Sequence, residues 1–223
     1  MDKLKTLTER KEEILFLMKY AVPESHADAA EALLNKYDSD IIALNLLHSF
    51  YIRLPEGTDD SVKALRLLNR RQGVFLLCAS TGNGLHYLYL VNNESAYILG
   101  TMAEGILEQE LLDFFGYSDN KEVLAVTKEP EKLQEYRPYV ADSDLCPSCH
   151  AAIGEFHTLG CPVEICPWCG GQLTYCNCRF VKLDIETVDK ESQIEKLLEL
   201  LEEAGRIAFK KEHSPGYPTM DDE

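Results

Sequence analysis

The sequence predicts an α+β fold, in which an N-terminal helical region precedes a small antiparallel sheet with a helix, and a cysteine-rich C-terminal module precedes a terminal helix. Three observations lead to this prediction. Apolar residues recur at helical spacing through the first 72 residues, and the period becomes that of extended strands after Gly73. Seven of the eight cysteines fall between Cys146 and Cys178, which indicates a small module held together by cysteine chemistry.

Residues 1–72 are predicted to be the helical region. Thr6 and Glu9 have the spacing of a capping box that starts a first helix. Asp38 or Ser39 is expected to cap a later helix that is apolar nearly all round. A helix that is apolar on all sides is expected at the centre of a domain.

A last helix of this region is predicted over residues 58–71. It carries the clearest basic patch of the chain, formed by Lys63, Arg66, Arg70 and Arg71. The simpler interpretation is a solvated face that balances nearby carboxylates. The alternative is a contact with phosphate groups or with an acidic partner.

Residues 73–140 are predicted to form a three-stranded antiparallel meander plus a helix, as one unit with residues 1–72. The strands are expected at residues 74–79, 85–91 and 96–99, where turn residues separate apolar runs. The helix is expected from residue 104 to 115, with Gly116 as its left-handed cap. Residues 117–145 are polar and contain two prolines, so we predict a connector there.

The cysteines of the C-terminal region have metal-ligand spacing. Two Cys-x-x-Cys pairs, which begin at Cys146 and Cys166, each form a tight turn whose two sulfurs point the same way. Four such thiolates suffice for one tetrahedral Zn²⁺, and the remaining cysteines with one histidine make a second set of four. We expect two zinc ions, and one at minimum, bound by Cys146, Cys149, His157, Cys161, Cys166, Cys169, Cys176 and Cys178.

Two pairings of these ligands satisfy the same spacing. In the interleaved pairing, which we favour, the two Cys-x-x-Cys pairs hold one ion and the other four residues hold the second. The reason is that the two pairs form matched turns, and matched turns usually face one another. In the sequential pairing, the first four ligands hold one ion and the last four hold the other. His150 follows Cys149 directly and is an alternative to His157 as a ligand.

A disulfide framework is the other interpretation of this cysteine density. It would need an oxidising compartment, and the early apolar run at residues 14–18 is short and follows Glu12 and Glu13, unlike a signal peptide. We therefore expect reduced cysteines and a cytoplasmic protein without a membrane-spanning segment. We identify no internal repeat in the sequence.

The expected metal sites are closed. A catalytic zinc keeps one position open to water, whereas two sets of four protein ligands leave none. The pattern of zinc deaminases is also absent, because Glu155 precedes His157 and Ile165 stands where that pattern has proline. Glu164 could act as a base, but a solvated or capping carboxylate is the simpler interpretation. We assign no catalytic residue and do not expect an enzyme.

We place the zinc-binding, ribbon-like module at residues 141–187, and a C-terminal helix and tail at residues 188–223. Within the module, residues 180–185 are predicted to be a strand that closes the ribbon. The terminal helix is expected over residues 189–204, where apolar residues recur on one face and Gly205 follows.

The chain is strongly acidic, with a formal net charge of −16 over 223 residues. Such a charge repels phosphate backbones and favours basic partners. The cysteine-rich run from residue 146 to 181 contains one arginine, Arg179, and no lysine. It therefore lacks the cations with which zinc modules grip nucleic acids, and its metal is expected to be structural.

A specific pattern runs from residue 146 to 209. It consists of Cys-Pro-Ser-Cys at 146–149, Gly-Glu-Phe-His at 154–157, Gly-Cys at 160–161, Cys-Pro-Trp-Cys-Gly-Gly-Gln at 166–172, Cys-Asn-Cys at 176–178 and Gly-Arg-Ile-Ala-Phe at 205–209. This pattern resembles a cysteine-rich, zinc-ribbon-like C-terminal module of uncharacterised bacterial proteins. The resemblance implies a bacterial cytosolic zinc module with the eight ligands named above, and it implies no activity. Residues 1–140 resemble no family that we recognise.

The leading hypothesis is a non-catalytic interaction or accessory protein with structural zinc, whose acidic surface meets a protein partner with basic patches. A second hypothesis is nucleic-acid binding through the predicted helix 58–71 and the zinc-binding turns, which the net charge disfavours. A third is a redox sensor in which Cys176 and Cys178 release metal on oxidation. A fourth, a hydrolase centred on Cys78 with His86, is disfavoured because a cysteine inside a buried strand does not meet substrate.

Overall fold

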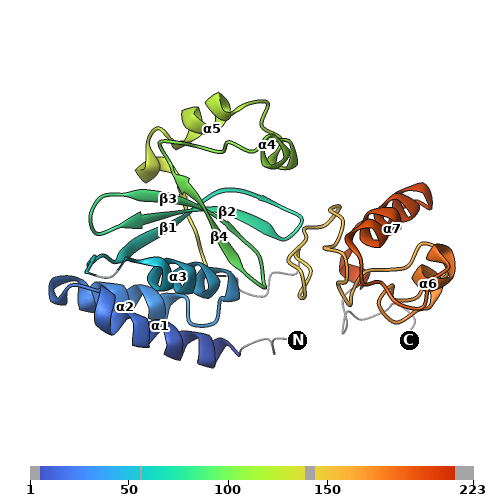
Figure 1. The fold of residues 1–223 in the computed structure, drawn as a ribbon, viewed down its shortest axis with the longest axis horizontal. Coiled ribbons are helices and arrows are strands. Elements are labelled where there is room, and N and C mark those ends of the chain that lie inside the picture. The colour runs from blue at the N-terminus through green and yellow to red at the C-terminus, as the bar shows by residue number, and fades with distance from the viewer. Residues whose placement is uncertain (1–5, 56, 139–143, 214–223) are drawn as a thin grey trace. The chain divides into compact units, whose positions relative to one another are not determined.

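The computed structural model describes residues 6–55, 57–138 and 144–213, and the chain divides into two compact units, residues 1–140 and 141–223. The first unit contains a five-stranded antiparallel sheet with helices on it, and the second contains the cysteine-rich segment with helices (Figure 1). The predicted α+β class is therefore confirmed.

The sheet of the first unit is a four-stranded meander extended by one short strand. Its strands are β1 (Val62–Arg71), β2 (Val74–Thr81), β3 (His86–Val91), β4 (Ala96–Thr101) and β5 (Gln134–Glu135), in the order β4-β3-β2-β1-β5. The three predicted strands correspond to β2, β3 and β4. Alternate side chains of β2 point to opposite faces, so that Phe75 and Leu77 enter one core while Leu76 and Cys78 enter another. Both faces of the sheet are therefore covered.

Three helices cover one face of the sheet (Figure 1). They are α1 (Leu7–Ala21), α2 (Ala27–Lys36) and α3 (Ile41–Arg53), with a short 3₁₀ turn (Glu24–His26) before α2. The capping box of Thr6 and Glu9 is present at the start of α1, as predicted. The cap of α3 is Asp40, whose side chain accepts a hydrogen bond from the amide of Ala43. Neither Asp38 nor Ser39 fills that role.

The opposite face is covered by α4 (Gln109–Phe115) and α5 (Asn120–Thr127) (Figure 1). α4 ends, as predicted, at Gly116 in the left-handed conformation. It does not begin at residue 104, because the Glu104 carboxylate instead accepts a hydrogen bond from the amide of Thr101 at 2.7 Å in a tight turn. α5 lies in the segment that we predicted to be a connector. Asp119 caps its start by accepting hydrogen bonds from the amides of Lys121 and Glu122.

The helix predicted over residues 58–71 is wrong, because this segment forms β1. Gln72 and Gly73 both have positive φ, 50° and 75°, which is the geometry of a two-residue hairpin turn between β1 and β2. The pairing of β1 with β2 is irregular between Val62 and Ala64 and again between Leu67 and Asn69. Each irregularity breaks the alternation of apolar residues, so the sequence of β1 does not show the period of a strand.

The basic residues of this strand are engaged within the first unit. Arg66 donates to two backbone carbonyls just before β5, one of them that of Leu133 at 3.2 Å. Arg71 donates to two carbonyls of α4, and Lys63 donates to the carbonyl of Gly82 at 3.2 Å. Three of the four residues of the predicted basic patch, Lys63, Arg66 and Arg71, therefore hold neighbouring backbone.

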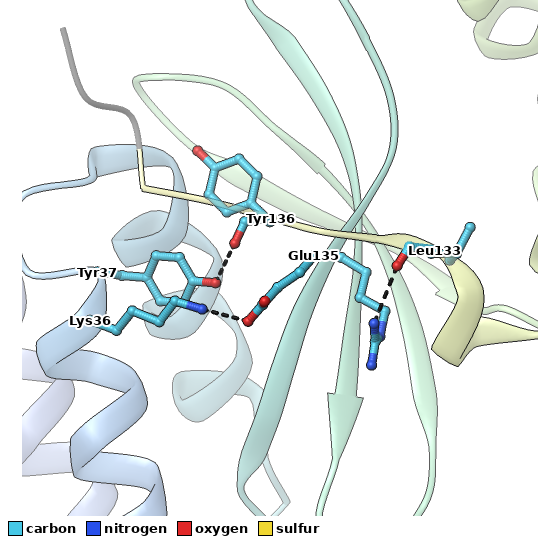
Figure 2. A network of polar contacts seen from close by, with 6 residues as sticks. Lys36, Tyr37, Leu133, Glu135 and Tyr136 are labelled. Atoms are coloured by element: carbon cyan, nitrogen blue, oxygen red, sulfur yellow. Dashed lines mark hydrogen bonds and ion pairs between the residues drawn. The ribbon is translucent and has the colours of Figure 1, made fainter.

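β5 is held in place by further polar contacts from the helical layer (Figure 2). The Lys36 ammonium lies 2.5 Å from the Glu135 carboxylate, and the Tyr37 hydroxyl donates to the carbonyl of Tyr136 at 2.6 Å. The Tyr136 hydroxyl donates in turn to the buried carboxylate of Asp40 at 2.9 Å. These contacts connect the end of α2 and the start of α3 to the edge of the sheet.

The second unit contains α6 (Cys178–Leu183), α7 (Glu191–Glu203) and a 3₁₀ turn (Lys211–His213). The strand predicted at residues 180–185 is wrong, because α6 occupies most of that segment. The amides of Phe180 and Val181 both donate to the carbonyl of Asn177, which starts a helical turn. α7 lies where the terminal helix is predicted. Across the described ranges, no helix of either unit is long and apolar enough to cross a bilayer.

Candidate metal centres

The structure gathers the eight predicted ligands into two groups of four. The first metal group is Cys146, Cys149, His157 and Cys161, and the second metal group is Cys166, Cys169, Cys176 and Cys178. The ligand atoms of each group lie within 4.8 Å of one another, so each group could hold one metal ion. His150, the alternative to His157, belongs to neither group.

The interleaved pairing that we favoured is therefore wrong, and the ligands are grouped sequentially. Each Cys-x-x-Cys pair joins the next two ligands along the chain. The physical reason is that sequential grouping closes shorter loops than interleaving, and the entropy cost of closing a loop grows with its length. The two matched turns are copies of one motif in two sites, and not two halves of one site.

This motif occurs at residues 145–152 and again at residues 165–172. In each copy the amide of the first cysteine donates to the carbonyl of Ala151 or Gly171, at 2.8 and 2.7 Å. The carbonyl of the same cysteine accepts from the amide of His150 or Gly170, both at 2.9 Å. His150 and Gly170 have positive φ, 59° and 74°. The chain thus has a structural repeat that we did not identify in the sequence.

The first metal group has the dimensions of a tetrahedral zinc site. Zn–S bonds of about 2.3 Å at tetrahedral angles place two sulfurs about 3.8 Å apart. The sulfurs of Cys146 and Cys161 are 3.7 Å apart, and the sulfur of Cys149 lies 3.3 Å from Nδ1 of His157. A disulfide would need a separation of about 2 Å, and all eight cysteines are free. The donor set therefore fits a zinc ion and not a disulfide framework.

Hydrogen bonds in the first copy of this motif, residues 145–152, favour the thiolate form of Cys146. The sulfur of Cys146 accepts hydrogen bonds from the thiols of Cys149 and Cys161 and from the amides of Cys149 and Ser148. The thiol bonds, with these amides, lower the pKa of Cys146 below the usual value of a thiol. Burial raises the pKa of Cys166, at the equivalent place in the second copy of the motif, and hydrogen bonds from two backbone amides oppose that rise. Thiolate is the form in which cysteine binds metal.

The first metal group is closed to solvent, since none of its four ligands is more than 5% exposed. The fully buried ring of Phe209 lies edge-on to the ring of His157, with centroids 5.3 Å apart. The backbone of Phe209 pairs with that of Gly154 and Glu155, at 3.0 and 2.8 Å. The segment that follows α7 therefore folds back over the first metal group and covers it.

Glu164 connects the surroundings of the two groups. Its amide donates to the carbonyl of Cys161, and its carbonyl accepts from the amide of Leu173. Its side chain is fully buried and pairs with Arg206 at 2.8 Å. Burial raises the pKa of the Glu164 carboxyl, and the hydrogen bond from Arg206 opposes that rise. Our expectation of a solvated or capping carboxylate is therefore wrong, because Glu164 is part of a buried ion pair.

The second metal group is more open than the first. Cys166 is buried, whereas Cys169 is exposed and Cys176 and Cys178 are partly exposed. Its buried side faces α7, from which Leu197 and Leu201 pack into the same apolar cluster as Cys166. The two groups thus differ in how easily a solute can reach their sulfurs.

Cys78 and His86 do not form a nucleophile and base. Cys78 is fully buried in β2, and burial raises the pKa of its thiol to about 11. Its sulfur lies 2.9 Å from the sulfur of Met102. Nδ1 of His86 lies 2.9 Å from the hydroxyl of Ser80. A neutral thiol in this setting is a packing residue.

A comparison of the chain with protein-family models, with curated proteins and with solved structures found no match. The resemblance to a zinc-ribbon-like bacterial module therefore stays a prediction. The structural feature that bears on function is the presence of two groups of cysteine and histidine, each of which could hold a metal ion.

Proposed function

We propose that this chain is a non-catalytic zinc-binding protein that takes part in a protein interaction, with one structural Zn²⁺ in each metal group. The observation that carries the proposal is that each group supplies four protein ligands around one point. Zinc in structural sites is four-coordinate, so neither ion would keep a position for water or substrate. The metal would act as a staple and not as a Lewis acid.

Zinc would supply much of the folding free energy of the second unit. Three of the six buried residues in one of its apolar clusters are the ligands Cys146, Cys149 and Cys161. Cys166 belongs to the other cluster. Modules with so small an apolar core usually need a metal or disulfides to fold. Binding of structural zinc is then equivalent to folding.

The partner is proposed to be a protein with a basic surface. The net charge of −16 repels nucleic acid. Lys63, Arg66 and Arg71 of β1 donate hydrogen bonds to backbone carbonyls of the first unit. The proposed location is the bacterial cytoplasm, where free thiols persist. A protein partner agrees with a chain whose net charge is far from zero.

Elemental analysis of protein purified without added metal tests this proposal. Two zinc ions per chain are expected. A single ion, or a different metal, would contradict the assignment of two structural zinc sites. Removal of the metal by a strong chelator is expected to make residues 144–213 sensitive to protease, because the staples of that unit are then gone. Unchanged protease resistance of the metal-free protein would contradict a structural role.

A redox sensor is a second candidate function, which one observation favours: Cys169, Cys176 and Cys178 are open to solvent to different degrees. Peroxide would oxidise two zinc-bound thiolates, which lose two electrons and join in an S–S bond. The peroxide gains these two electrons and two protons and becomes two water molecules. The disulfide no longer holds zinc, so the ion is released. Release of one zinc ion per chain by peroxide, reversed by a thiol reductant, is expected from a sensor. Zinc content that peroxide leaves unchanged would exclude it.

A further inference from the structure

A hollow of about 550 Å³ lies between α1 and α3 in the first unit. It contains no metal ligand, and the proposal for the zinc sites does not use it. The residues that line it are Glu9, Glu12, Glu13, Phe16 and Leu17 of α1, with His48 and Ile52 of α3. One end of the lining is therefore acidic, and the other is apolar.

The apolar part of the lining exposes large side chains. Phe16 and Ile52 are each 57% exposed, and both line the hollow. Tyr20 is 74% exposed, and its ring meets that of Phe16 edge-on at 5.3 Å. A single exposed apolar side chain is ordinary, but a contiguous group around a concavity usually marks a contact surface.

The acidic end follows from helical spacing. Glu9 and Glu13 are one turn apart on α1, with Glu12 beside them and Phe16 one turn further on. The lining contains no lysine or arginine. The polar group contributed by α3 is His48, whose Nδ1 lies 3.0 Å from the Arg10 guanidinium and whose Nε2 lies 3.5 Å from the Glu13 carboxylate.

We propose that this hollow is the docking site for a basic amphipathic helix of a protein partner. Apolar side chains of that helix would enter between Phe16 and Ile52, and its lysine or arginine side chains would face Glu9 and Glu12. Helix-in-groove recognition uses apolar anchors one turn apart, and opposite charges at the rim set orientation and association rate. The inference rests on the proposed function, because it names the surface with which the protein meets its partner.

The charge of the lining favours a basic helix over other occupants of the hollow. A two-fold contact between two copies of the chain would bring the same glutamates face to face. An anionic lipid surface or a nucleic acid would meet the same repulsion from Glu9, Glu12 and Glu13. A cationic helix is the occupant that both ends of the hollow accept.

The test uses the full-length, zinc-loaded protein and a fluorescent peptide of leucine and lysine, in which the leucines follow helical spacing. A scrambled peptide of the same composition is the control ligand. Fluorescence anisotropy is expected to show that the helical peptide binds tighter than the scrambled one, with an affinity that falls as salt rises. Phe16→Ser is expected to weaken binding tenfold or more, and Glu12→Lys, which leaves the capping box of Thr6 and Glu9 intact, is expected to weaken it as well.

Two variants of the same unit serve as matched controls. Tyr97 on β4 is as exposed as Phe16, at 57%, and Glu94 and Glu110 are exposed carboxylates away from the hollow. Tyr97→Ser, and the pair Glu94→Lys with Glu110→Lys, are expected to leave peptide binding within twofold. Melting temperatures of all variants show whether each one is folded.

Equal affinity for the two peptides, or binding that Phe16→Ser leaves unchanged, would overturn the docking site. A dimer in sedimentation equilibrium that Phe16→Ser dissociates would overturn it in favour of a second copy of the chain. Zinc content is measured on the same samples. Two ions per chain together with failed peptide binding would reject the docking site alone, whereas fewer than two ions would reject the proposed function.

Discussion

Glu164 and Arg206 form a buried ion pair between two segments that lie far apart in the sequence. The side chain of Glu164 is 0% exposed and that of Arg206 is 9% exposed, with 2.8 Å between the two charged atoms. Arg206 also donates to the carbonyl of His157 at 2.6 Å. The pair therefore ties the segment after α7 to the loop that carries a ligand of the first metal group.

Arg206→Ala is expected to destabilise the second unit by about 3–5 kcal/mol, because it leaves the Glu164 carboxylate buried without its partner. Denaturant unfolding of the zinc-loaded protein measures the loss. Lys196→Ala is the matched control, since it removes an exposed pair with Glu199 in the same unit. That change is expected to cost little, because the pair is exposed to solvent. Similar losses for both variants would contradict the buried link.

Phe209→Ala is expected to cost about 3–5 kcal/mol, because the ring is fully buried against His157 and the surrounding residues cannot fill its volume. The same variant should release zinc from the first metal group faster, since it opens the cover of that group. Val181→Ala, which shortens a side chain that is 74% exposed, is the control and is expected to change little. Zinc release from Phe209→Ala at the rate of the unmodified protein would show that this ring is not a cover.

The two metal groups are expected to lose zinc in a fixed order. A coloured chelator should take one ion per chain quickly, from the group that contains the exposed Cys169, and the second ion slowly, from the buried group. Absorbance of the chelator complex over time measures both phases. Cys169→Ser should remove the fast phase and leave the slow one. A single phase for both ions would contradict the difference in access.

The sequence alone indicated the eight candidate ligands but not how they are grouped. Residue type and spacing led to the eight positions that the structure gathers, because a Cys-x-x-Cys turn is set by local backbone geometry. Which turn shares an ion with which later ligand depends on the path of the chain between them. The repeated motif at residues 145–152 and 165–172 would have indicated the sequential grouping. The sequence hides this repeat, because His150 occupies the left-handed position that Gly170 fills in the other copy.

The sheet was only partly predictable for a related reason. β2 and β3 alternate or are apolar throughout, so their period was visible. β1 was not, because two register irregularities disrupt its alternation and its charged residues at 63, 66, 70 and 71 fit a helical face as well as a strand. The hairpin between β1 and β2 closes through the positive φ of Gln72. Residues other than glycine adopt positive φ only rarely, so the sequence does not indicate this turn.

Arg66→Met tests whether the cations of β1 serve structure. The change removes donors to the carbonyls of Glu131 and Leu133 beside β5, and it is expected to cost about 1–3 kcal/mol of stability. Arg137→Met, at an exposed position nearby, is the control and should cost less than about 0.5 kcal/mol. Nucleic-acid binding by the unmodified protein that Arg66→Met abolishes without loss of stability would instead support the nucleic-acid hypothesis.

Native mass spectrometry of two double variants tests the central claim most directly, because it counts the zinc ions that each chain retains. Cys146→Ser with Cys161→Ser damages one metal group and is expected to retain one ion. Cys146→Ser with Cys166→Ser damages both groups and is expected to retain none. Interleaved sites would give the opposite result, with none in the first variant and one in the second, and that outcome would contradict two sequential, four-ligand zinc sites.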